Sequence, residues 1–220
     1  MPLSTKSPVF VTGGTGYIGR PLIEAVLARG YDVRALVRSG SEGKLAAAAI
    51  RVAGNALDAS TFADRIAAGA TVVHLVGTSH PNPSKAAEFR RVDLTSIRAT
   101  VEAARRAHAR HLVYVSVAHP APVMQAYIAA RQEGEAAVRA SGLPATIVRP
   151  WYVLGPGHYW PIVLVPIYAL LRLLPATRAG AERLGLVTRR ALVATLLRAV
   201  EEPPAAGVRI IEVPEIRRMA

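Results

Sequence analysis

The sequence contains no cysteine, few aromatic residues and few acidic ones. Without cysteine the chain can form no disulfide, thiol nucleophile or cysteine-based metal site. No charged-then-apolar signal segment precedes the first apolar strand, so we expect a cytoplasmic location. The most apolar run, residues 161–174 (PIVLVPIYALLRLL), is too short to span a bilayer and is interrupted by Pro166 and Arg172. We interpret it as a core or dimer helix, which leaves a homodimer open, with membrane-surface contact as the weaker alternative.

The remaining composition indicates one α/β domain, with or without a small appendage. The chain has 220 residues, of which 51% are hydrophobic, enough for a substantial core. Lysine and arginine number 27 against 15 acids, a net charge of +12. Such an excess can indicate nucleic acid, an anionic membrane or an acidic substrate. The arginines are spread evenly and are not interleaved with aromatics, so we rank nucleic acid below a small-molecule partner.

A glycine-rich stretch near the amino end organises the rest of the chain. Residues 9–11 form a short apolar β-branched run, and residues 18–29 carry apolar side chains at helical spacing, closed by Gly30. A strand, a glycine turn and a helix that starts at that turn make an anion site suited to a dinucleotide pyrophosphate. The residues predicted to hold it are Gly13, Gly14, Thr15, Gly16, Tyr17, Ile18 and Gly19.

The glycine spacing points to a family. Thr12-Gly-Gly-Thr-Gly-Tyr-Ile-Gly19 has the form Gly13-x-x-Gly16-x-x-Gly19. It resembles the short-chain dehydrogenase/reductase superfamily in its extended and atypical branches, which include NmrA-like proteins and the Rossmann-type subunit of respiratory complex I. The resemblance covers residues 9–157 well and the remainder loosely, and it implies a bound NAD(P).

Strand and helix patterns alternate along the chain and predict an α/β fold, a doubly wound parallel sheet of Rossmann type. Residues 1–157 would form the NAD(P)-binding core, and residues 158–220 a small cap that completes the same domain. Expected strands are 9–11, 32–38, 50–53, 71–77, 111–116, 145–148 and an edge strand at 208–213. Expected helices are 18–29, 43–50, 60–68, 88–109, 123–140 and 188–201.

The end of the second strand favours NADP over NAD. Such folds place there an acid for the ribose 2′-hydroxyl or an arginine for the 2′-phosphate. No acid lies between Val33 and Gly40, whereas Arg34, Arg38 and Ser39 do. Arg38 is preferred because its guanidinium can pair with a phosphate through two hydrogen bonds. The alternative is a solvated strand end.

The resemblance implies further coenzyme contacts. The segment that contains Asn55 and Ala56 is similar to the one over the adenine in this superfamily, with asparagine in place of the usual acid. Val76 and Gly77 would lie at the nicotinamide ribose, and Pro150 follows the sixth strand at the same edge. Asp58 ends the same segment, and it has an alternative explanation because it can cap the helix that follows.

The family's proton-transfer residues are a serine after strand five and a Tyr-x-x-x-Lys on the next helix. The resemblance assigns these roles to Ser116, Tyr127 and Arg131, with arginine in place of lysine. Arginine keeps the charge that favours a phenolate, but its planar head differs in shape from an ammonium. Two alternatives therefore stay open: the site catalyses with an altered geometry, or it binds its ligand without catalysis. Without the resemblance, Tyr127 reads as a half-buried aromatic on an amphipathic helix.

Aromatic residues gather after the sixth strand, where open α/β sheets bind ligands. Trp151, Tyr152 and His158 are the predicted substrate contacts. Packing of the carboxyl-terminal lobe explains the aromatic residues equally well. His74 reads as a hydrogen-bonded core histidine, and His108 and His111 straddle a helix end unsuited to a metal, so no metal site is predicted.

Two functions from different classes follow. The first is an NADP(H)-dependent atypical short-chain oxidoreductase acting on a small or aromatic carbonyl compound, with NAD as the second choice of coenzyme. The second is a non-catalytic dinucleotide-sensing regulator or accessory subunit, favoured by the arginine at position 131. A nucleic-acid surface is a weaker third reading.

Overall fold

The computed structural model describes residues 6–41, 43 and 45–219. A seven-stranded sheet runs through it in the order β3–β2–β1–β4–β5–β6–β9, and every neighbouring pair is parallel. Its strands are β1 (Val9–Thr12), β2 (Val33–Val37), β3 (Ile50–Ala53), β4 (Thr71–His74), β5 (His111–Val115), β6 (Ala145–Arg149) and β9 (Val208–Glu212). The expected strands, including the carboxyl-terminal edge strand, are confirmed.

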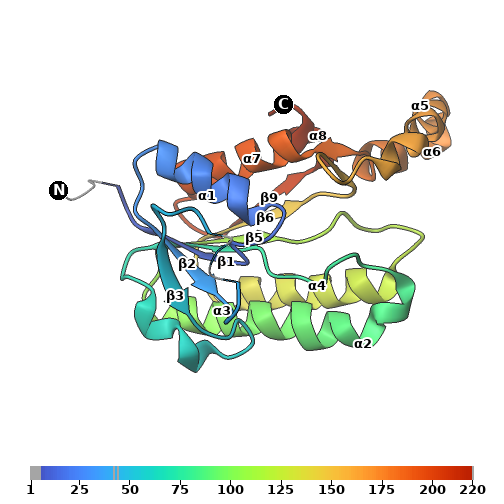
Figure 1. Cartoon of the computed structure of the whole chain (residues 1–220). Coiled ribbons are helices and arrows are strands. Elements are labelled where there is room, and N and C mark those ends of the chain that lie inside the picture. Colours follow the sequence, from blue (N-terminus) through green and yellow to red (C-terminus); the bar gives the residue numbers. More distant parts are fainter. Residues whose placement is uncertain (1–5, 42, 44, 220) are drawn as a thin grey trace.

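Helices cover both faces of this sheet (Figure 1). Helices α1 (Gly19–Ala28), α7 (Arg189–Glu201) and α8 (Val213–Arg217) lie on one face, and α3 (Thr95–Arg106) and α4 (Gln125–Ala140) on the other. Each layer encloses its own apolar cluster against the sheet, one around Ile23 and Leu196, the other around Ile97 and Tyr114. The doubly wound Rossmann arrangement is therefore confirmed.

The order of the strands reverses beside β1. This strand pairs with β2 on one side and with β4 on the other, so that Thr12 lies opposite both Leu36 and His74. In open parallel sheets such a reversal leaves a crevice at the carboxyl ends of the strands, because successive connections leave in opposite directions. The segments that follow Thr12 and His74 meet at that crevice.

Three expected helices differ from the structure. Within the range 43–50, residues 45–49 form bends and turns and Ile50 already belongs to β3, while residue 44 lies outside the described residues. A segment of that length is marginal as an isolated helix, and Leu45 and Ala49 are buried in the apolar cluster around Ile23. Residues 60–68 form only the 3₁₀ turns η2 (Ala59–Thr61) and η3 (Ala63–Arg65). There the Thr61 hydroxyl donates to the Asp58 carbonyl and competes with α-helical bonding.

The third difference lies in residues 88–109. The helical stretch begins earlier, with the 3₁₀ turn η4 (Pro83–Lys85) and α2 (Ala86–Glu88), and it continues as the π-helical turn η5 (Phe89–Leu94) and then α3. A π turn holds one more residue per turn than an α-helix, so it changes which side chains face the sheet. Such turns are frequent at functional sites.

A small second sheet carries a projecting hairpin of helices. Strands β7 (Val153–Leu154) and β8 (Val187–Thr188) are parallel, and between them lie η6 (Trp160–Leu164), α5 (Val165–Leu173) and α6 (Pro175–Arg183). Helices α5 and α6 extend away from the body of the molecule (Figure 1). None of the described residues of α5 is buried, so the interpretation of residues 161–174 as a core helix is wrong.

Candidate functional site

A groove of about 460 Å³ opens at the carboxyl ends of β1, β2, β3 and β4. Eight of the predicted coenzyme residues line it together: Gly13, Thr15, Gly16, Arg38, Asn55, Ala56, Val76 and Gly77. They come from four separate connections that only the parallel sheet brings to one edge. The groove therefore lies where the strand order predicts a dinucleotide site.

The glycine loop is shaped by backbone contacts that no side chain could replace. Gly13 has a φ of 75°, and a Cβ on it would lie 2.8 Å from the backbone carbon of Leu75. A Cβ on Gly19 would collide with the Gly13 carbonyl oxygen. Among the described residues no side chain caps the start of α1 at Ile18. The positive dipole end of that helix is thus left to an anion, and the loop fits a pyrophosphate.

Gly14, Ile18 and Tyr17 serve the loop in other ways. A Cβ on Gly14 would lie 2.7 Å from the Ile23 side chain, so this glycine allows the loop to pack on α1. Ile18 packs against the core and precedes the first residue of α1. The Tyr17 ring instead contacts His158, with ring centres 5.0 Å apart. None of the three lines the groove.

The two predicted phosphate arginines lie at opposite ends of β2. Arg38 follows the strand, is exposed and lines the groove. Arg34 lies near the strand's beginning, where its guanidinium donates to the Arg65 carbonyl oxygen at 2.9 Å. Four residues of extended chain, about 13 Å, separate them, so the assignment of Arg34 to the coenzyme is not supported by its position. Ser39 is exposed beside Arg38, and Ser41 is the serine that lines the groove.

The end of the groove that is predicted to hold the adenine contains a local turn. The Asn55 side-chain oxygen accepts from the Leu57 N–H at 3.1 Å, which leaves the side-chain amide group to meet a ligand. Asp58 accepts from the Ser60 N–H at 3.0 Å and so caps η2, as the capping interpretation predicts. Its pKa is lowered by hydrogen bonds from the Ser60 side chain and backbone.

Sequence reasoning missed the opposite wall of the groove. Glu88, Arg91 and Val92 line it from the end of α2 and from η5. Arg91 gives the groove a second arginine besides Arg38. The regular helix expected over 88–109 carried no signal for this position, and Arg91 lies in the π turn that stands in its place.

Arg131 is buried and tied to Asp93, a residue that sequence reasoning also missed. One terminal nitrogen lies 2.6 Å from Asp93, and another donates to the Val115 carbonyl oxygen at 2.9 Å. Asp93 also accepts from the N–H and hydroxyl of Thr78, at 3.1 and 2.6 Å. Burial acts to lower the pKa of Arg131, but the neighbouring Tyr127, Tyr114 and Asp93 raise it, so the guanidinium stays charged.

Tyr127 lies over this guanidinium. The central carbon of Arg131 is 5.1 Å from the centre of its ring, as the i, i+4 spacing on α4 predicts. The ring also contacts Phe89 at 4.9 Å and packs against a small cluster of Val117, Ala121 and Ile128. The side chain is half-buried. Tyr127 and Arg131 thus form one unit beside the groove.

Ser116 does not join that unit. It is 3% exposed, and its hydroxyl donates to Glu135 at 2.7 Å. Glu135 also accepts from Arg149, at 2.8 and 2.6 Å, and from Arg139 at 2.9 Å. Burial raises the pKa of Glu135, but Arg149 and Ser116 outweigh it and hold the value at about 2. The side chain of Ser116 faces this buried carboxylate, not the groove, and the predicted catalytic placement is not observed.

The predicted substrate residues surround the start of the hairpin. Trp151 and Tyr152 contact each other edge to face at 5.4 Å, and Tyr152 contacts Trp160 in the same manner at 5.2 Å. His158 lies between Tyr17 and His80, 5.5 Å from the latter. Pro150 is buried after β6 and does not line the groove.

The other buried histidines have structural roles. The hydroxyls of Thr12 and Thr100 both lie within hydrogen-bond distance of the His74 Nδ1, at 2.9 Å. Burial, helped by Arg131, lowers its pKa to about 3. This confirms the interpretation of His74 as a hydrogen-bonded core residue.

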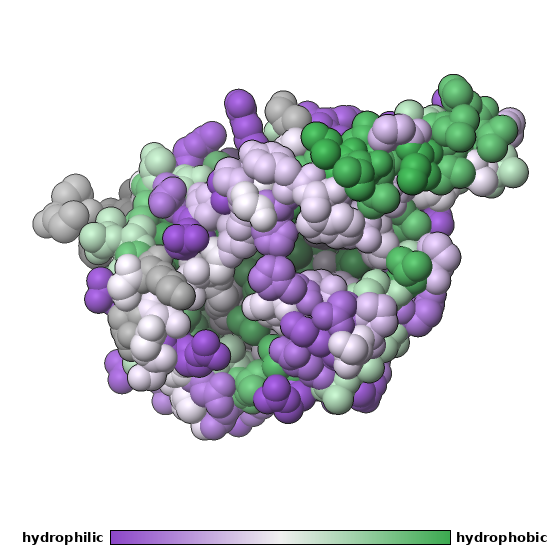
Figure 2. All heavy atoms as spheres, turned by 45° about the vertical axis from the view of Figure 1, so that its right-hand side comes forward, coloured by the Kyte–Doolittle hydropathy of each residue, from purple (hydrophilic) through white to green (hydrophobic). Residues whose placement is uncertain are grey.

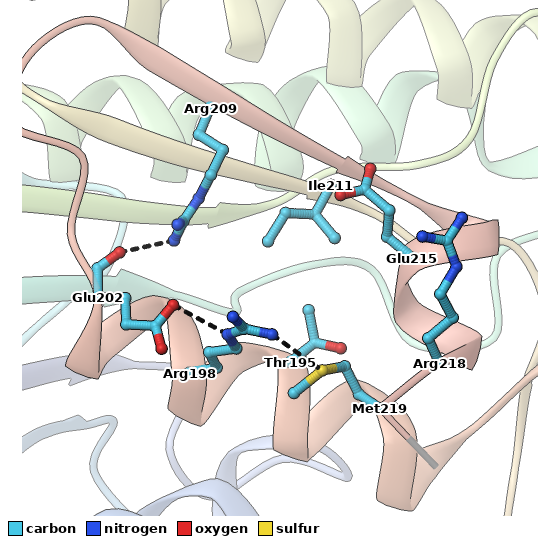
Figure 3. A pocket seen from close by; sticks show the side chains of 8 residues that line it. All are labelled: Thr195, Arg198, Glu202, Arg209, Ile211, Glu215, Arg218 and Met219. Carbon is cyan, nitrogen blue, oxygen red and sulfur yellow. Dashed lines mark hydrogen bonds and ion pairs between the residues drawn. The ribbon is translucent and has the colours of Figure 1, made fainter.

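A second, smaller cavity of about 230 Å³ lies between α7, β9 and α8 (Figure 3). Two of the three arginines that line it are bonded within it: Arg198 pairs with Glu202 at 2.9 Å, and Arg209 donates to the Glu202 carbonyl oxygen at 2.8 Å. It contains none of the predicted site residues.

Two kinds of feature are absent from the described part of the chain. No group of three or more metal-binding side chains occurs among those residues. Nor does any helix there have the length and apolarity needed to cross a bilayer. A homodimer and a cytoplasmic location stay predictions.

Comparison with known proteins agrees with the groove. A family model described as NAD(P)H-binding matches residues 13–157. A ceramide reductase of Caulobacter vibrioides is 31% identical over 220 residues, 99% of this chain and 68% of that protein. A 4-hydroxy-2-methyl-3-oxo-4-farnesyl-3,4-dihydroquinoline-1-oxide ketoreductase of Stigmatella aurantiaca is 30% identical over 168 residues, 66% of this chain and 50% of that protein. The chain thus spans half to about two thirds of these relatives' lengths.

Solved structures share the fold. The Bordetella bronchiseptica enzyme WbmH, in complex with NAD⁺, is 20% identical with a TM-score of 0.69, over 94% of this chain and 75% of that one. WbmG from the same organism, in complex with NAD, is 21% identical with a TM-score of 0.69, over 96% and 74%.

Proposed function

The chain belongs to the NAD(P)H-binding family within the short-chain dehydrogenase/reductase superfamily, and on that premise we propose that it reduces a carbonyl group with NADPH. One observation carries the proposal: Arg131 connects the coenzyme groove to Tyr127. A Cβ on Gly77, which lines the groove, would collide with a terminal nitrogen of Arg131. The same guanidinium lies 5.1 Å from the Tyr127 ring.

The residues that line the groove support the following placement of the coenzyme. The loop from Gly13 to Gly16 and the start of α1 would hold the pyrophosphate, and Asn55 the adenine. Arg38 would pair with the 2′-phosphate that distinguishes NADPH from NADH. Gly77 would lie at the nicotinamide ribose. When bound, the coenzyme supplies a hydride.

Tyr127 would supply the matching proton. Its phenol would give a proton to the carbonyl oxygen as the carbonyl carbon takes the hydride, which leaves an alcohol and a phenolate. The charge of Arg131 stabilises that phenolate, and Asp93 holds the guanidinium in place. Solvent can return the proton because the side chain of Tyr127 is only half-buried.

We place the substrate among carbonyl compounds with an aromatic or long apolar part. Trp151, Tyr152 and Trp160 form a row of edge-to-face contacts at this end of the molecule, and His158 stands beside the glycine loop. The names of the two relatives, a ceramide reductase and a farnesyl-quinoline ketoreductase, support this class.

A second function has its own support. Ser116 is turned toward Glu135, and Arg131 is paired with Asp93 in place of a free lysine. Both observations favour a dinucleotide-sensing regulator or accessory subunit that binds the coenzyme without turnover.

Calorimetry followed by a turnover assay separates the two. We expect NADPH to bind more tightly than NADH, and NADPH to be consumed with aromatic or long-chain ketones. Coenzyme binding without consumption on any ketone would favour the regulator. Failure to bind either coenzyme would exclude both functions.

A further inference from the structure

The hairpin of residues 159–183, here called the apolar arm, exposes an unusual amount of apolar surface. Nine of its large apolar side chains are exposed: Tyr159, Trp160, Ile162, Val163, Val165, Ile167, Leu170, Leu173 and Leu174. Figure 2 shows these hydrophobic residues gathered on the projecting part of the molecule, at upper right. Contiguous apolar patches on a soluble monomer are normally small, so a patch of this kind marks an interaction surface.

The shape of the arm leaves this surface without a covering element. Helix α5 projects from the body alongside α6 (Figure 1), and exposure reaches 77% at Leu173 near its end. A helix of nine residues is about 14 Å long, which is too short to cross a hydrocarbon core of about 30 Å. A partner would therefore meet the arm from one side.

The charges of the arm favour an anionic partner. Its charged residues are Arg172, Arg178, Arg183 and Glu182, a net charge of 3 − 1 = +2, within a chain of net charge +12. The Arg178 side chain is 68% exposed. Pairing with a second copy would bring like charges together, whereas anionic lipid headgroups would neutralise them. Apolar side chains bordered by arginines are the pattern of helices that lie in a bilayer interface.

Aromatic residues at the base of the arm agree with that partner. Tyr159 and Trp160 are 57% and 59% exposed. Tryptophan and tyrosine are enriched at the level of lipid headgroups, because their rings are apolar and their edges polar. They lie where the arm leaves the body, at the depth that a headgroup layer would occupy.

We propose that the apolar arm docks the protein on the surface of an anionic lipid bilayer. The apolar side chains of η6 and α5 enter the boundary between headgroups and acyl chains, and the arginines contact lipid phosphates. The proposal does not depend on catalysis. Leu184, which follows the arm, packs against the same cluster as Tyr127, so docking brings the substrate end of the groove near the membrane.

Co-sedimentation of the full chain with vesicles tests the proposal. We expect binding to phosphatidylcholine vesicles that contain phosphatidylglycerol, weaker binding to phosphatidylcholine alone, and release from the former as salt is raised. Tryptophan emission should shift to the blue on binding, and Trp160→Phe should remove most of that shift.

The apolar contribution is tested by exposed positions whose replacement does not affect the core. Ile167→Ser/Leu170→Ser/Leu173→Ser should weaken vesicle binding at least about a hundred-fold. The control Ile50→Ser/Val123→Ser alters side chains of similar exposure, 55% and 50%, outside the arm and should bind as wild type. Equal loss in the control would overturn the proposal.

The ionic contribution has a closely matched control. Arg178 and Arg106 each pair with a glutamate one turn away on an exposed helix, at 68% and 58% side-chain exposure. Arg178→Gln should weaken binding to anionic vesicles about five-fold, and Arg106→Gln should not. No binding to either vesicle, or self-association that the triple serine variant abolishes without vesicle binding, would overturn the proposal, the latter in favour of a second copy.

Discussion

The guanidinium of Arg131 lies one helical turn from Tyr127, with its central carbon 5.1 Å from the centre of the tyrosine ring. The same guanidinium is 2.6 Å from Asp93 and touches the groove at Gly77. This contact joins the groove proposed to bind the coenzyme to the group proposed to transfer the proton.

Removing the phenol should stop turnover without affecting coenzyme binding. Tyr127→Phe deletes only the hydroxyl, and the packing of the ring on Phe89 and Arg131 is kept. We expect kcat to fall by about 10²- to 10⁴-fold, the usual contribution of a positioned acid, with NADPH affinity unchanged by calorimetry. Tyr159→Phe, which alters an exposed tyrosine, is the control and should retain activity. Full activity in Tyr127→Phe would remove this residue from the chemistry.

The buried ion pair should matter strongly for stability when it is broken on one side. Arg131→Met leaves the carboxylate of Asp93 buried without its cation, which should cost about 3–5 kcal/mol in the free energy of unfolding measured with urea. Arg131→Met/Asp93→Leu should recover part of that loss, because no unpaired charge remains. Arg98→Met, which loses an exposed pair with Glu133, should cost less than about 1 kcal/mol. A loss in Arg131→Met no larger than in Arg98→Met would contradict this account.

The choice of coenzyme should depend on Arg38 and not on Arg34 at the other end of β2. Arg38→Ala should weaken NADPH binding about ten- to a hundred-fold, the value of a charge-assisted contact, and leave NADH binding nearly unchanged. Arg34→Ala is the matched control on the same strand, since its guanidinium is bound to the Arg65 carbonyl oxygen away from the groove. An equal effect of Arg38→Ala on both coenzymes would show that Arg38 does not read the 2′-phosphate.

Two buried histidines should make the fold sensitive to acid. Burial lowers the pKa of both His74 and His111 from 6.5 to about 3. Between these values the unfolded chain binds protons that the folded chain does not, so stability is present above pH 6.5 and falls as pH decreases toward 3. At pH 5 each histidine should have lost about 2 kcal/mol. Urea unfolding at pH 7 and pH 5 measures this, and equal stability at both values would refute it.

Much of the fold was readable from local patterns. Short apolar runs separated by glycine and helical periodicity predicted every strand of the main sheet. The spacing of Gly13, Gly16 and Gly19 predicted the loop that the structure shows, because the conformation at Gly13 and the close approach at Gly19 depend on the absence of a side chain. The i, i+4 relation of Tyr127 and Arg131 is likewise a property of any helix.

Other features depended on residues far apart in the chain. The partners of Arg131 and Ser116 are Asp93 and Glu135, and neither follows from spacing. Arg91 lines the groove from a π turn that stands where a regular α-helix is expected. Residues 161–174 are apolar enough for a core, yet most of them lie exposed on the apolar arm. Apolar periodicity and glycine act on the backbone within a few residues, so they can be recognised in the chain itself. Burial and charge pairing depend on which surfaces packing brings opposite one another, and that is settled only when the sheet and its helices assemble.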